Sequence, residues 1–134
     1  LMAQFDDKEN NIEVLNAGHL PLYRYSAKEG EVVEITPSGL GLGLNDGVIF
    51  EKNLKTVTIG MEKNDIFVFC TDGVTEAMNK FKEEFGEERL KELILKYKDE
   101  NSADMIKKIR DDIMEFLDGE ELHDDFTMVI VKIK

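Results

Sequence analysis

An unbroken apolar run, Ile66–Cys70, leads directly into the tripeptide Thr71-Asp72-Gly73 and restricts the fold of the whole chain. A strand that is apolar at every position is typical of burial on both faces, so packed layers are expected on each side of it. A second apolar run, residues 126–133, follows the tripeptide His123-Asp124-Asp125 near the end of the chain. Each run therefore has a carboxylate where a predicted strand meets a loop, and rigid scaffolds often hold functional groups at such positions.

The order of the remaining predicted elements indicates an α+β fold. Strand-like segments fill the first half of the chain, at residues 1–5, 12–17, 20–25, 32–36, 48–50 and 54–59. Helical spacing follows, in a short helix that starts just after Gly73, in residues 87–97 and in a helix that Ser102 caps. The last apolar run returns as a strand, so we expect one domain with a largely antiparallel sheet.

The composition excludes several classes of function. The 134 residues include 29 acidic and 17 basic side chains, and the net charge of −12 repels the phosphates of nucleic acids. No apolar run approaches the roughly 18 residues of a membrane span, and the sequence begins without a signal peptide's basic stretch and long apolar core. The single cysteine, Cys70, excludes a disulfide framework. We therefore expect a cytoplasmic domain that contacts neither nucleic acid nor membrane through this segment.

Asp72 and Asp124 are the best candidates for functional residues. They are far apart in the sequence, so only folding could bring them together. Two carboxylates that converge at strand ends form half of a site for hard divalent cations, which prefer oxygen ligands. Each motif also has a simpler interpretation, because Asp72 could be a helix-capping or turn residue and Asp124 and Asp125 a solvated turn. Their joint placement favours metal binding, and the hydroxyl of Thr127 could hold a ligand carboxylate in position.

The other motifs favour structural interpretations. The glycine-rich residues 39–43 lack the strand, helix and lysine of a phosphate-binding loop. His19 is more typical of a hydrogen-bonded turn histidine than of a catalytic one, and acids in predicted turns, such as Asp65, are expected to be surface charges. No serine or cysteine has the surroundings of an activated nucleophile. A haloacid-dehalogenase-type phosphatase would need an aspartate where Cys70 stands, and the chain lacks the alternating βα pattern of a receiver domain.

Taken together, the motifs resemble the bacterial PPM-type serine/threonine protein phosphatases, and most closely the stage II sporulation protein E-like branch, which includes sigma-factor regulators. The segments that carry the resemblance occur in the family's order and span nearly the whole chain: residues 16–21, 41–43, 64–77, 85–90 and 124–127. The resemblance implies an antiparallel β-sandwich flanked by helices in αββα layers. It also implies Mn²⁺- or Mg²⁺-dependent hydrolysis of phosphoserine or phosphothreonine in a regulatory partner protein, such as an anti-sigma-factor antagonist.

The resemblance assigns Asp72 and Asp124 as metal ligands. Asp125, Thr127 and Gly73 are the candidates for residues that support those ligands. In such enzymes two cations activate a water molecule and neutralise charge on the phosphoryl oxygens, so no covalent protein nucleophile is needed.

The sequence departs from the family at one point. The family's Gly-Asp pair, whose aspartate bridges both metals, has no counterpart in residues 1–134. We therefore expect residues 1–134 to be the C-terminal portion of a phosphatase domain whose N-terminal part is absent. We expect this portion to be inactive alone. An unpaired sheet edge or bare apolar face would lead such a fragment to self-associate. The alternative is a non-catalytic regulatory or interaction domain with the phosphatase fold.

Overall fold

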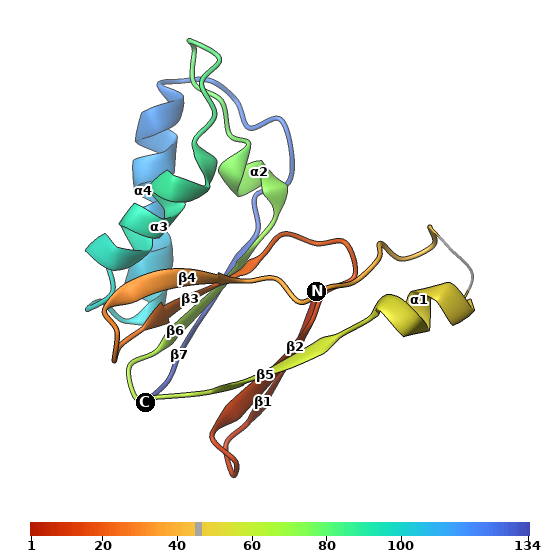
Figure 1. Cartoon of the computed structure of the whole chain (residues 1–134). Helices are drawn as coiled ribbons and strands as arrows, with labels where there is room; N and C mark the ends of the chain where they lie inside the picture. The colour runs from red at the N-terminus through yellow and green to blue at the C-terminus, as the bar shows by residue number, and fades with distance from the viewer. Residues whose placement is uncertain (45–46) are drawn as a thin grey trace.

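The computed structural model describes residues 1–44 and 47–134. Its strands are β1 (Met2–Asp6), β2 (Asn11–Leu15), β3 (Leu22–Ser26), β4 (Glu31–Ile35), β5 (Thr56–Gly60), β6 (Ile66–Cys70) and β7 (Met128–Lys132). Its helices are α1 (Gly47–Asn53), α2 (Asp72–Thr75), α3 (Gly86–Lys96) and α4 (Ser102–Leu117). The strands form a three-stranded sheet in the order β1-β2-β5 and a four-stranded sheet in the order β4-β3-β6-β7 (Figure 1). Every pairing is antiparallel.

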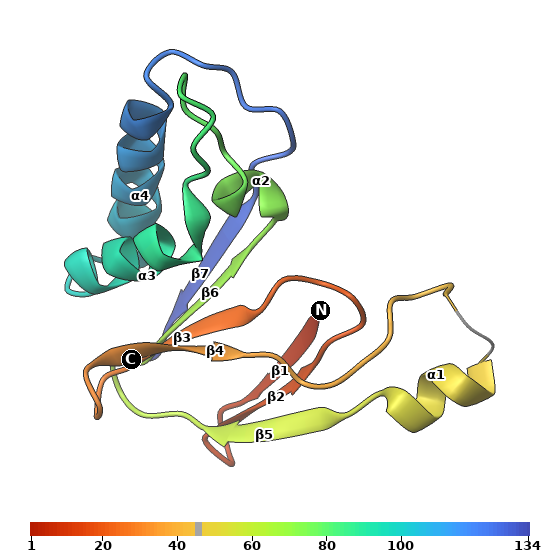
Figure 2. The ribbon, with the colours of Figure 1, turned by 45° about the horizontal axis from the view of Figure 1, so that its top comes forward.

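The four-stranded sheet is buried on both faces. Phe67 of β6 faces a core shared with Ile12 and Val14 of the three-stranded sheet. Ile66 and Val68 face the second core, which the apolar stripes of α3 and α4 complete. Figure 2 shows the resulting order of layers: helices, four-stranded sheet, three-stranded sheet. The apolar run of β6 thus marks a central strand, and the prediction of an α+β fold with antiparallel sheets and flanking helices is confirmed.

The helical layer lies on one side of the sandwich. Helices α2, α3 and α4 cover the outer face of the four-stranded sheet, whereas α1 projects from the sandwich just before the start of β5 (Figures 1 and 2). In the part of the chain that is described, no helix covers the outer face of the three-stranded sheet. Across the same residues, no helix has both the length and the hydrophobicity that crossing a membrane would require.

Two predictions of local structure were wrong. Residues 48–50, expected as a strand, belong to helix α1, where the exposed Val48 and Ile49 lie on a projecting turn. A short apolar run cannot be distinguished from a helix by periodicity alone. The cap of α4 is Asn101 rather than Ser102: the Asn101 side chain accepts a hydrogen bond from the Asp104 amide at 3.0 Å. Asparagine and serine are about equally good caps, so the sequence did not separate these neighbours.

The prediction for Asp65 was also wrong. It was expected to be a surface charge, but its side chain is completely buried. Its Oδ2 atom accepts hydrogen bonds from Arg24 Nη2 at 2.6 Å and Nε at 3.1 Å, and its Oδ1 atom accepts one from the Ala27 amide at 2.9 Å. The carboxylate therefore joins the start of β6 to β3. The local sequence of a turn does not show whether an acid in it is buried and hydrogen-bonded or exposed to solvent.

The pairing of β6 with β7 positions the acidic motifs. The two strands are antiparallel neighbours, with Cys70 opposite Met128. The end of β6 therefore lies beside the start of β7. Asp72, two residues after β6, and Asp124, four residues before β7, reach the same end of the four-stranded sheet.

Candidate metal centre

Thr71 joins the two acidic motifs. Its hydroxyl donates a hydrogen bond to the carbonyl oxygen of Asp125 at 2.6 Å and accepts one from the amide of Thr127 at 3.0 Å. Its own amide donates to the carbonyl oxygen of Thr127 at 3.1 Å. These bonds extend the β6–β7 pairing beyond the regular strands and fix the Asp124–Asp125 turn against the start of α2. Sequence reasoning missed Thr71, although its position opposite Thr127 follows from the register of the two strands.

Gly73 allows the two segments to touch. A Cβ atom at this position would lie 2.6 Å from the carbonyl oxygen of Asp125 and 3.1 Å from that of Asp124. The first distance is too short for a Cβ atom and the second is tight, so the backbone of residues 124–125 packs directly on the first turn of α2. The structure therefore brings Gly73 against the backbone of Asp124 and Asp125. The predicted approach of the Asp72 and Asp124 side chains stays a prediction.

The carboxylates of Asp72 and Asp124 are exposed to solvent. Asp72 Oδ1 accepts a hydrogen bond from the Gly73 amide at 3.0 Å, and Asp124 Oδ1 accepts one from the Asp125 amide at 2.7 Å. Within the described residues, no protein donor reaches the Oδ2 atom of either side chain. Each carboxylate is thus oriented by its own backbone and keeps one oxygen free for a ligand.

Each acid lines a hollow of its own. Asp72 lines one of about 480 Å³ together with Thr71 and His19. Asp124 lines a smaller one of about 110 Å³ together with Gly73 and Glu76. Nowhere in residues 1–44 and 47–134 do three or more His, Cys, Asp or Glu side chains gather around one point where a metal ion could bind. Within the described residues, this end of the sheet therefore carries two exposed carboxylates on touching segments and no complete set of potential metal ligands.

A buried asparagine shapes the larger hollow. The side-chain amide of Asn16 donates to the carbonyl oxygen of His19 at 2.9 Å and accepts from the His19 amide at 2.8 Å. Gly18, with φ of 85°, packs against Gly41, where a Cβ would lie 2.7 Å from the Gly41 Cα. Gly39 and Gly41 therefore serve as close-packing positions for the loop that carries His19. His19 is exposed, and its Nδ1 atom lies 3.2 Å from the Leu20 carbonyl oxygen.

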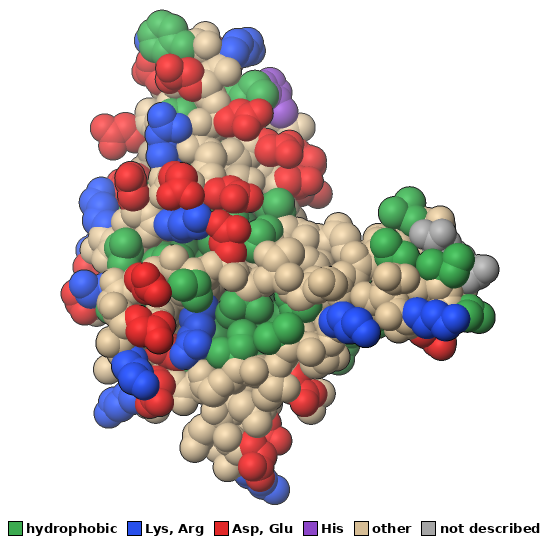
Figure 3. Space-filling view, viewed as in Figure 1, with side chains coloured by type: hydrophobic (Ala, Val, Ile, Leu, Met, Phe, Trp, Pro, Cys, Tyr) green, Lys and Arg blue, Asp and Glu red, His purple; other side chains and the backbone are tan. Residues whose placement is uncertain are grey.

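Two titratable groups, Cys70 and Tyr23, lie in the core between the four-stranded sheet and the helices. Burial, followed by the charges of Glu87 and Asp72, raises the pKa of the Cys70 thiol to about 12. The Tyr23 hydroxyl is buried without a hydrogen-bond partner in the described part of the chain, and burial together with the Glu87 charge raises its pKa well above its usual value. Both shifts favour the protonated form, which is a poor nucleophile. The groups of this region that remain available to a ligand are the exposed carboxylates of Asp72 and Asp124. Figure 3 shows acidic side chains spread over this face of the helical layer.

Comparison of the sequence with known families and proteins gives consistent matches. The family described as stage II sporulation protein E (SpoIIE) has a model that matches residues 1–134. Phosphoserine phosphatase RsbU of Bacillus subtilis (strain 168) is 30% identical to this chain over 134 residues. The match covers 98% of this chain but 38% of RsbU, so the chain spans well under half of that relative's length.

Solved structures share the fold. The SiaA-PP2C domain of Pseudomonas aeruginosa superposes with a TM-score of 0.82 at 16% identity, over 98% of this chain and 50% of that one. The phosphatase domain of the cell fate determinant SpoIIE from Bacillus subtilis, presoaked with Mn, has a TM-score of 0.72 at 15% identity. That match covers 98% of this chain and 55% of the other. At these identities the structural matches establish the arrangement of sheets and helices.

Proposed function

Because this chain belongs to the stage II sporulation protein E family, we propose that it carries the cation-binding end of a protein phosphatase. The reaction is the hydrolysis of phosphoserine or phosphothreonine in a cytoplasmic regulatory partner, such as an anti-sigma-factor antagonist. The relative RsbU, which is named a phosphoserine phosphatase, supports the reaction class. The observation that carries the proposal is the contact of Gly73 with the backbone of Asp124 and Asp125, which joins the two acidic motifs. Since the chain spans 38% of RsbU, the activity of a whole protein is part of the proposal.

The donor atoms fit Mn²⁺ or Mg²⁺. Asp72 and Asp124 each present a free carboxylate oxygen at the surface, and hard divalent cations prefer such ligands. Mg²⁺ is commonly held by one or two carboxylates together with waters and substrate phosphate oxygens, so an incomplete protein shell is compatible with it. The SpoIIE domain presoaked with Mn supports the same class of ion. When bound, the cation supplies Lewis-acid activation of water and neutralises phosphoryl charge.

The residues of the chain take separate roles around that ion. Asp72 and Asp124 bind it, and Gly73 permits the close approach that brings their segments together. Thr71 fixes the Asp124–Asp125 turn through its hydrogen bonds to the backbone of Asp125 and Thr127. Asp125 and Thr127 thereby help to hold the ligand carboxylates in position. Without a cation, two exposed carboxylates at this end of a chain of net charge −12 would repel a phosphate group. Substrate binding at this end should therefore depend on the metal.

A titration with Mn²⁺ tests the proposal directly on the 134-residue chain. Free Mn²⁺ is followed by its electron paramagnetic resonance signal for the wild type, Asp72→Asn and Asp124→Asn. We expect each substitution to raise the Kd for Mn²⁺ by roughly tenfold or more, because replacing a carboxylate with an amide removes the charged ligand and keeps its shape. The matched control is Asp111→Asn, an exposed acid on α4. Equal weakening in the control would mean that Mn²⁺ binds through net charge alone.

Activity provides the second test. In a longer protein that contains this sequence, we expect Asp72→Asn and Asp124→Asn to remove most of the Mn²⁺-dependent hydrolysis of p-nitrophenyl phosphate and of a serine-phosphorylated substrate. Turnover like that of the wild type at limiting Mn²⁺ would show that these residues are not the ligands.

One observation favours a second candidate function. No group of three or more potential ligands gathers in the described residues, which also suits a non-catalytic regulatory or interaction domain that keeps the fold. The same titration separates the two functions. A chain that leaves Mn²⁺ free but still binds a phosphorylated regulatory protein would be a binding domain.

A further inference from the structure

The segment between α2 and α3 folds back on itself. Met78 and Glu84 form an antiparallel bridge at its base, and we call residues 78–84 the 78–84 loop. Figures 1 and 2 show this loop at one end of the helical layer, beside the segment that leads from α4 through Asp124 to β7. The loop therefore lies close to the candidate metal centre.

A buried asparagine fixes the conformation of the loop. Asn79 is buried, and its Oδ1 atom accepts hydrogen bonds from the amides of Phe81 at 2.9 Å and Glu83 at 3.1 Å. Its Nδ2 atom donates to the Glu83 carboxylate at 2.9 Å. The Lys82 amide donates to the Asn79 carbonyl oxygen at 2.9 Å, and Lys82 has a φ of 62°. These bonds all lie within the loop, so they hold its tip in place without help from other segments.

The tip of the loop presents an aromatic side chain between two basic ones. Phe81 is 73% exposed, and among the exposed large hydrophobic side chains of the described residues it is the only aromatic one. The Lys80 Nζ atom lies 5.3 Å from the centre of the Phe81 ring. Lys82 is exposed and has no ion-pair partner in the part of the chain that the structure describes. Figure 3 shows hydrophobic and basic side chains together at this end of the molecule.

The loop also contacts the surroundings of Asp124. Met78, at its base, lines the hollow of about 110 Å³ that Asp124 lines. Lys80, at its tip, forms an ion pair with Asp118, which begins the segment that leads to Asp124. Phe81 follows Met78 by three residues, which span at most about 10 Å of extended chain. A protein whose phosphoserine reaches the candidate metal centre therefore comes within reach of Phe81.

We propose that the 78–84 loop docks the phosphorylated protein substrate. Phe81 enters an apolar depression of the partner, about 10 Å from its phosphoserine, and Lys80 and Lys82 contact carboxylates around that depression. Aromatic anchors within a polar rim are typical of protein interfaces. The inference rests on the proposed phosphatase function and adds to it the surface that selects the partner. A small phosphate ester such as p-nitrophenyl phosphate makes none of these contacts.

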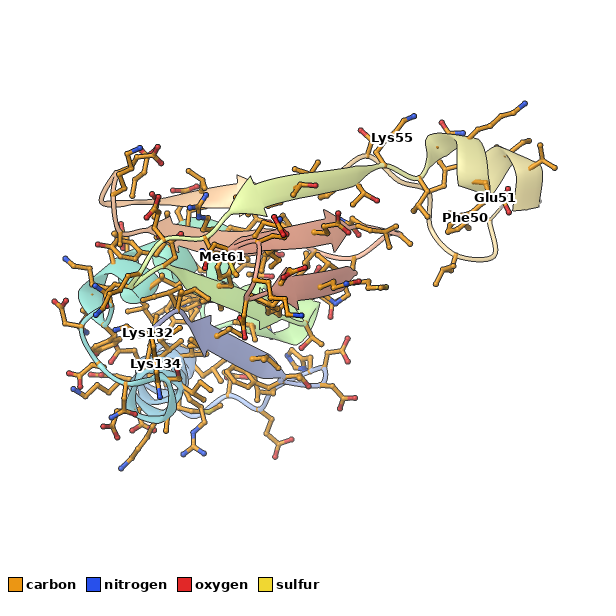
Figure 4. The ribbon with its side chains drawn as sticks, turned by 90° about the horizontal axis from the view of Figure 1, so that it is seen from below. Phe50, Glu51, Lys55, Met61, Lys132 and Lys134 are labelled. Atoms are coloured by element: carbon orange, nitrogen blue, oxygen red, sulfur yellow. The ribbon has the colours of Figure 1, made fainter. Side chains whose placement is uncertain are left out.

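Helix α1 is the other element that projects from the molecule. Figure 4 shows it away from the sheets, with Phe50 and Glu51 on it. None of its described residues lines the hollow beside Asp72 or the hollow beside Asp124. The position of the 78–84 loop therefore favours it over α1 as the docking element.

Steady-state kinetics at saturating Mn²⁺, in a longer protein that contains this sequence, tests the proposal with two substrates. One is a serine-phosphorylated anti-sigma-factor antagonist, and the other is p-nitrophenyl phosphate. Phe81→Ala should raise the KM for the antagonist by roughly tenfold, because the anchor is lost. It should leave kcat for the antagonist and both constants for p-nitrophenyl phosphate unchanged, since docking adds equally to binding before and during the reaction. The matched control is Met114→Ala, which shortens an exposed side chain of α4 and should change neither substrate's kinetics.

A charge reversal tests the rim of the same contact. Lys82→Glu should raise the KM for the antagonist by roughly threefold at low salt, because it repels acids of the partner. The difference should disappear at high salt, which screens exposed charges. Lys107→Glu, the same change at an exposed lysine of α4, is the matched control.

Several outcomes would overturn the docking proposal. An unchanged KM in Phe81→Ala, or an equal change in Met114→Ala, would exclude Phe81 as the anchor. A loss of stability in Phe81→Ala on urea denaturation would mean that Phe81 packs against another part of the longer protein. A raised KM in Val48→Ala alone, at a side chain of α1 that is 62% exposed, would assign docking to that helix.

The docking and phosphatase proposals can fail separately. A wild-type protein that hydrolyses p-nitrophenyl phosphate but not the antagonist would overturn the docking proposal and leave the phosphatase proposal in place. A wild-type protein that is inactive on both substrates would overturn both.

Discussion

Strand β6 has an aspartate at each end, and the two ends behave in opposite ways. Asp65, before the strand, is completely buried and bonded to Arg24 and to the amides of Ala27 and Glu62. Asp72, after the strand, is exposed and keeps a free oxygen, as does Asp124 beside it. A carboxylate whose hydrogen bonds are all satisfied by the protein stabilises the fold, whereas one that remains unsatisfied is available to a ligand. The difference separates the structural end of this sheet from its candidate functional end.

The largest expected effect concerns Asp65. Asp65→Asn leaves the Arg24 guanidinium, whose side chain is 15% exposed, without its counter-charge. Breaking a buried ion pair in this way costs about 3–5 kcal/mol of unfolding free energy. Urea denaturation followed by circular dichroism measures it. A loss below about 1 kcal/mol would mean that the buried end of the strand is no more structural than the exposed end.

Gly73→Ala should have the next largest effect, because the new Cβ forces apart the segments that meet at the candidate metal centre. We expect a loss of about 1–3 kcal/mol in unfolding free energy and weaker Mn²⁺ binding. The matched control is Gly60→Ala on β5, where an added Cβ has no neighbour within 4 Å. Retention of wild-type stability and Mn²⁺ affinity by Gly73→Ala would contradict the close contact.

Asp112 of α4 is intermediate between Asp65 and Asp72 in its burial and pairing, because its side chain is partly exposed and forms an ion pair with Lys96. Burial raises the pKa of its carboxyl, but hydrogen bonds from Lys96 and Tyr97 outweigh that effect and hold the pKa below its usual value. The folded state therefore releases the proton more readily than the unfolded chain. The resulting stability is present above the unfolded pKa of about 4 and is lost as the pH falls through the lower folded value.

Asp112→Asn should lower the unfolding free energy by about 0.5–1 kcal/mol at pH 7, since the ion pair is partly exposed. The difference from the wild type should shrink as the pH is lowered toward 2, which urea midpoints at a series of pH values would show. A difference that stays constant with pH would mean that the carboxylate charge contributes nothing.

The smallest effect on the fold is expected at the candidate metal centre itself. Asp72→Asn and Asp124→Asn should change the unfolding free energy by less than about 0.5 kcal/mol in the absence of metal, because both side chains are exposed. Excess Mn²⁺ should stabilise the wild-type chain and not the variants, since a ligand that binds only the folded state raises its stability. Thermal denaturation with and without Mn²⁺ measures both quantities. Stabilisation of the variants to the wild-type level would place the ion elsewhere.

The sequence predicted most of the architecture because burial leaves local patterns. The continuous apolar run of β6 identified a strand covered on both faces, and the stripes of α3 and α4 identified the helices that cover it. The prediction of a strand at residues 48–50 was wrong, because an apolar run of three residues is too short to distinguish strand periodicity from helix periodicity. Asp72 and Asp124 were found from their positions at strand ends, and their role as ligands stays a prediction.

The sequence by itself determined that this chain folds as layered sheets and helices, since apolar periodicity and turn residues are local properties. The tertiary structure decided which of its acids are satisfied, because the partners of the Asp65 carboxylate, such as Arg24 and the Ala27 amide, lie tens of residues away in the sequence. It also decided that Gly73 must lack a side chain, because the Asp125 carbonyl oxygen lies where a Cβ atom would be. Those properties depend on pairing and close approach between distant segments, which no local pattern records.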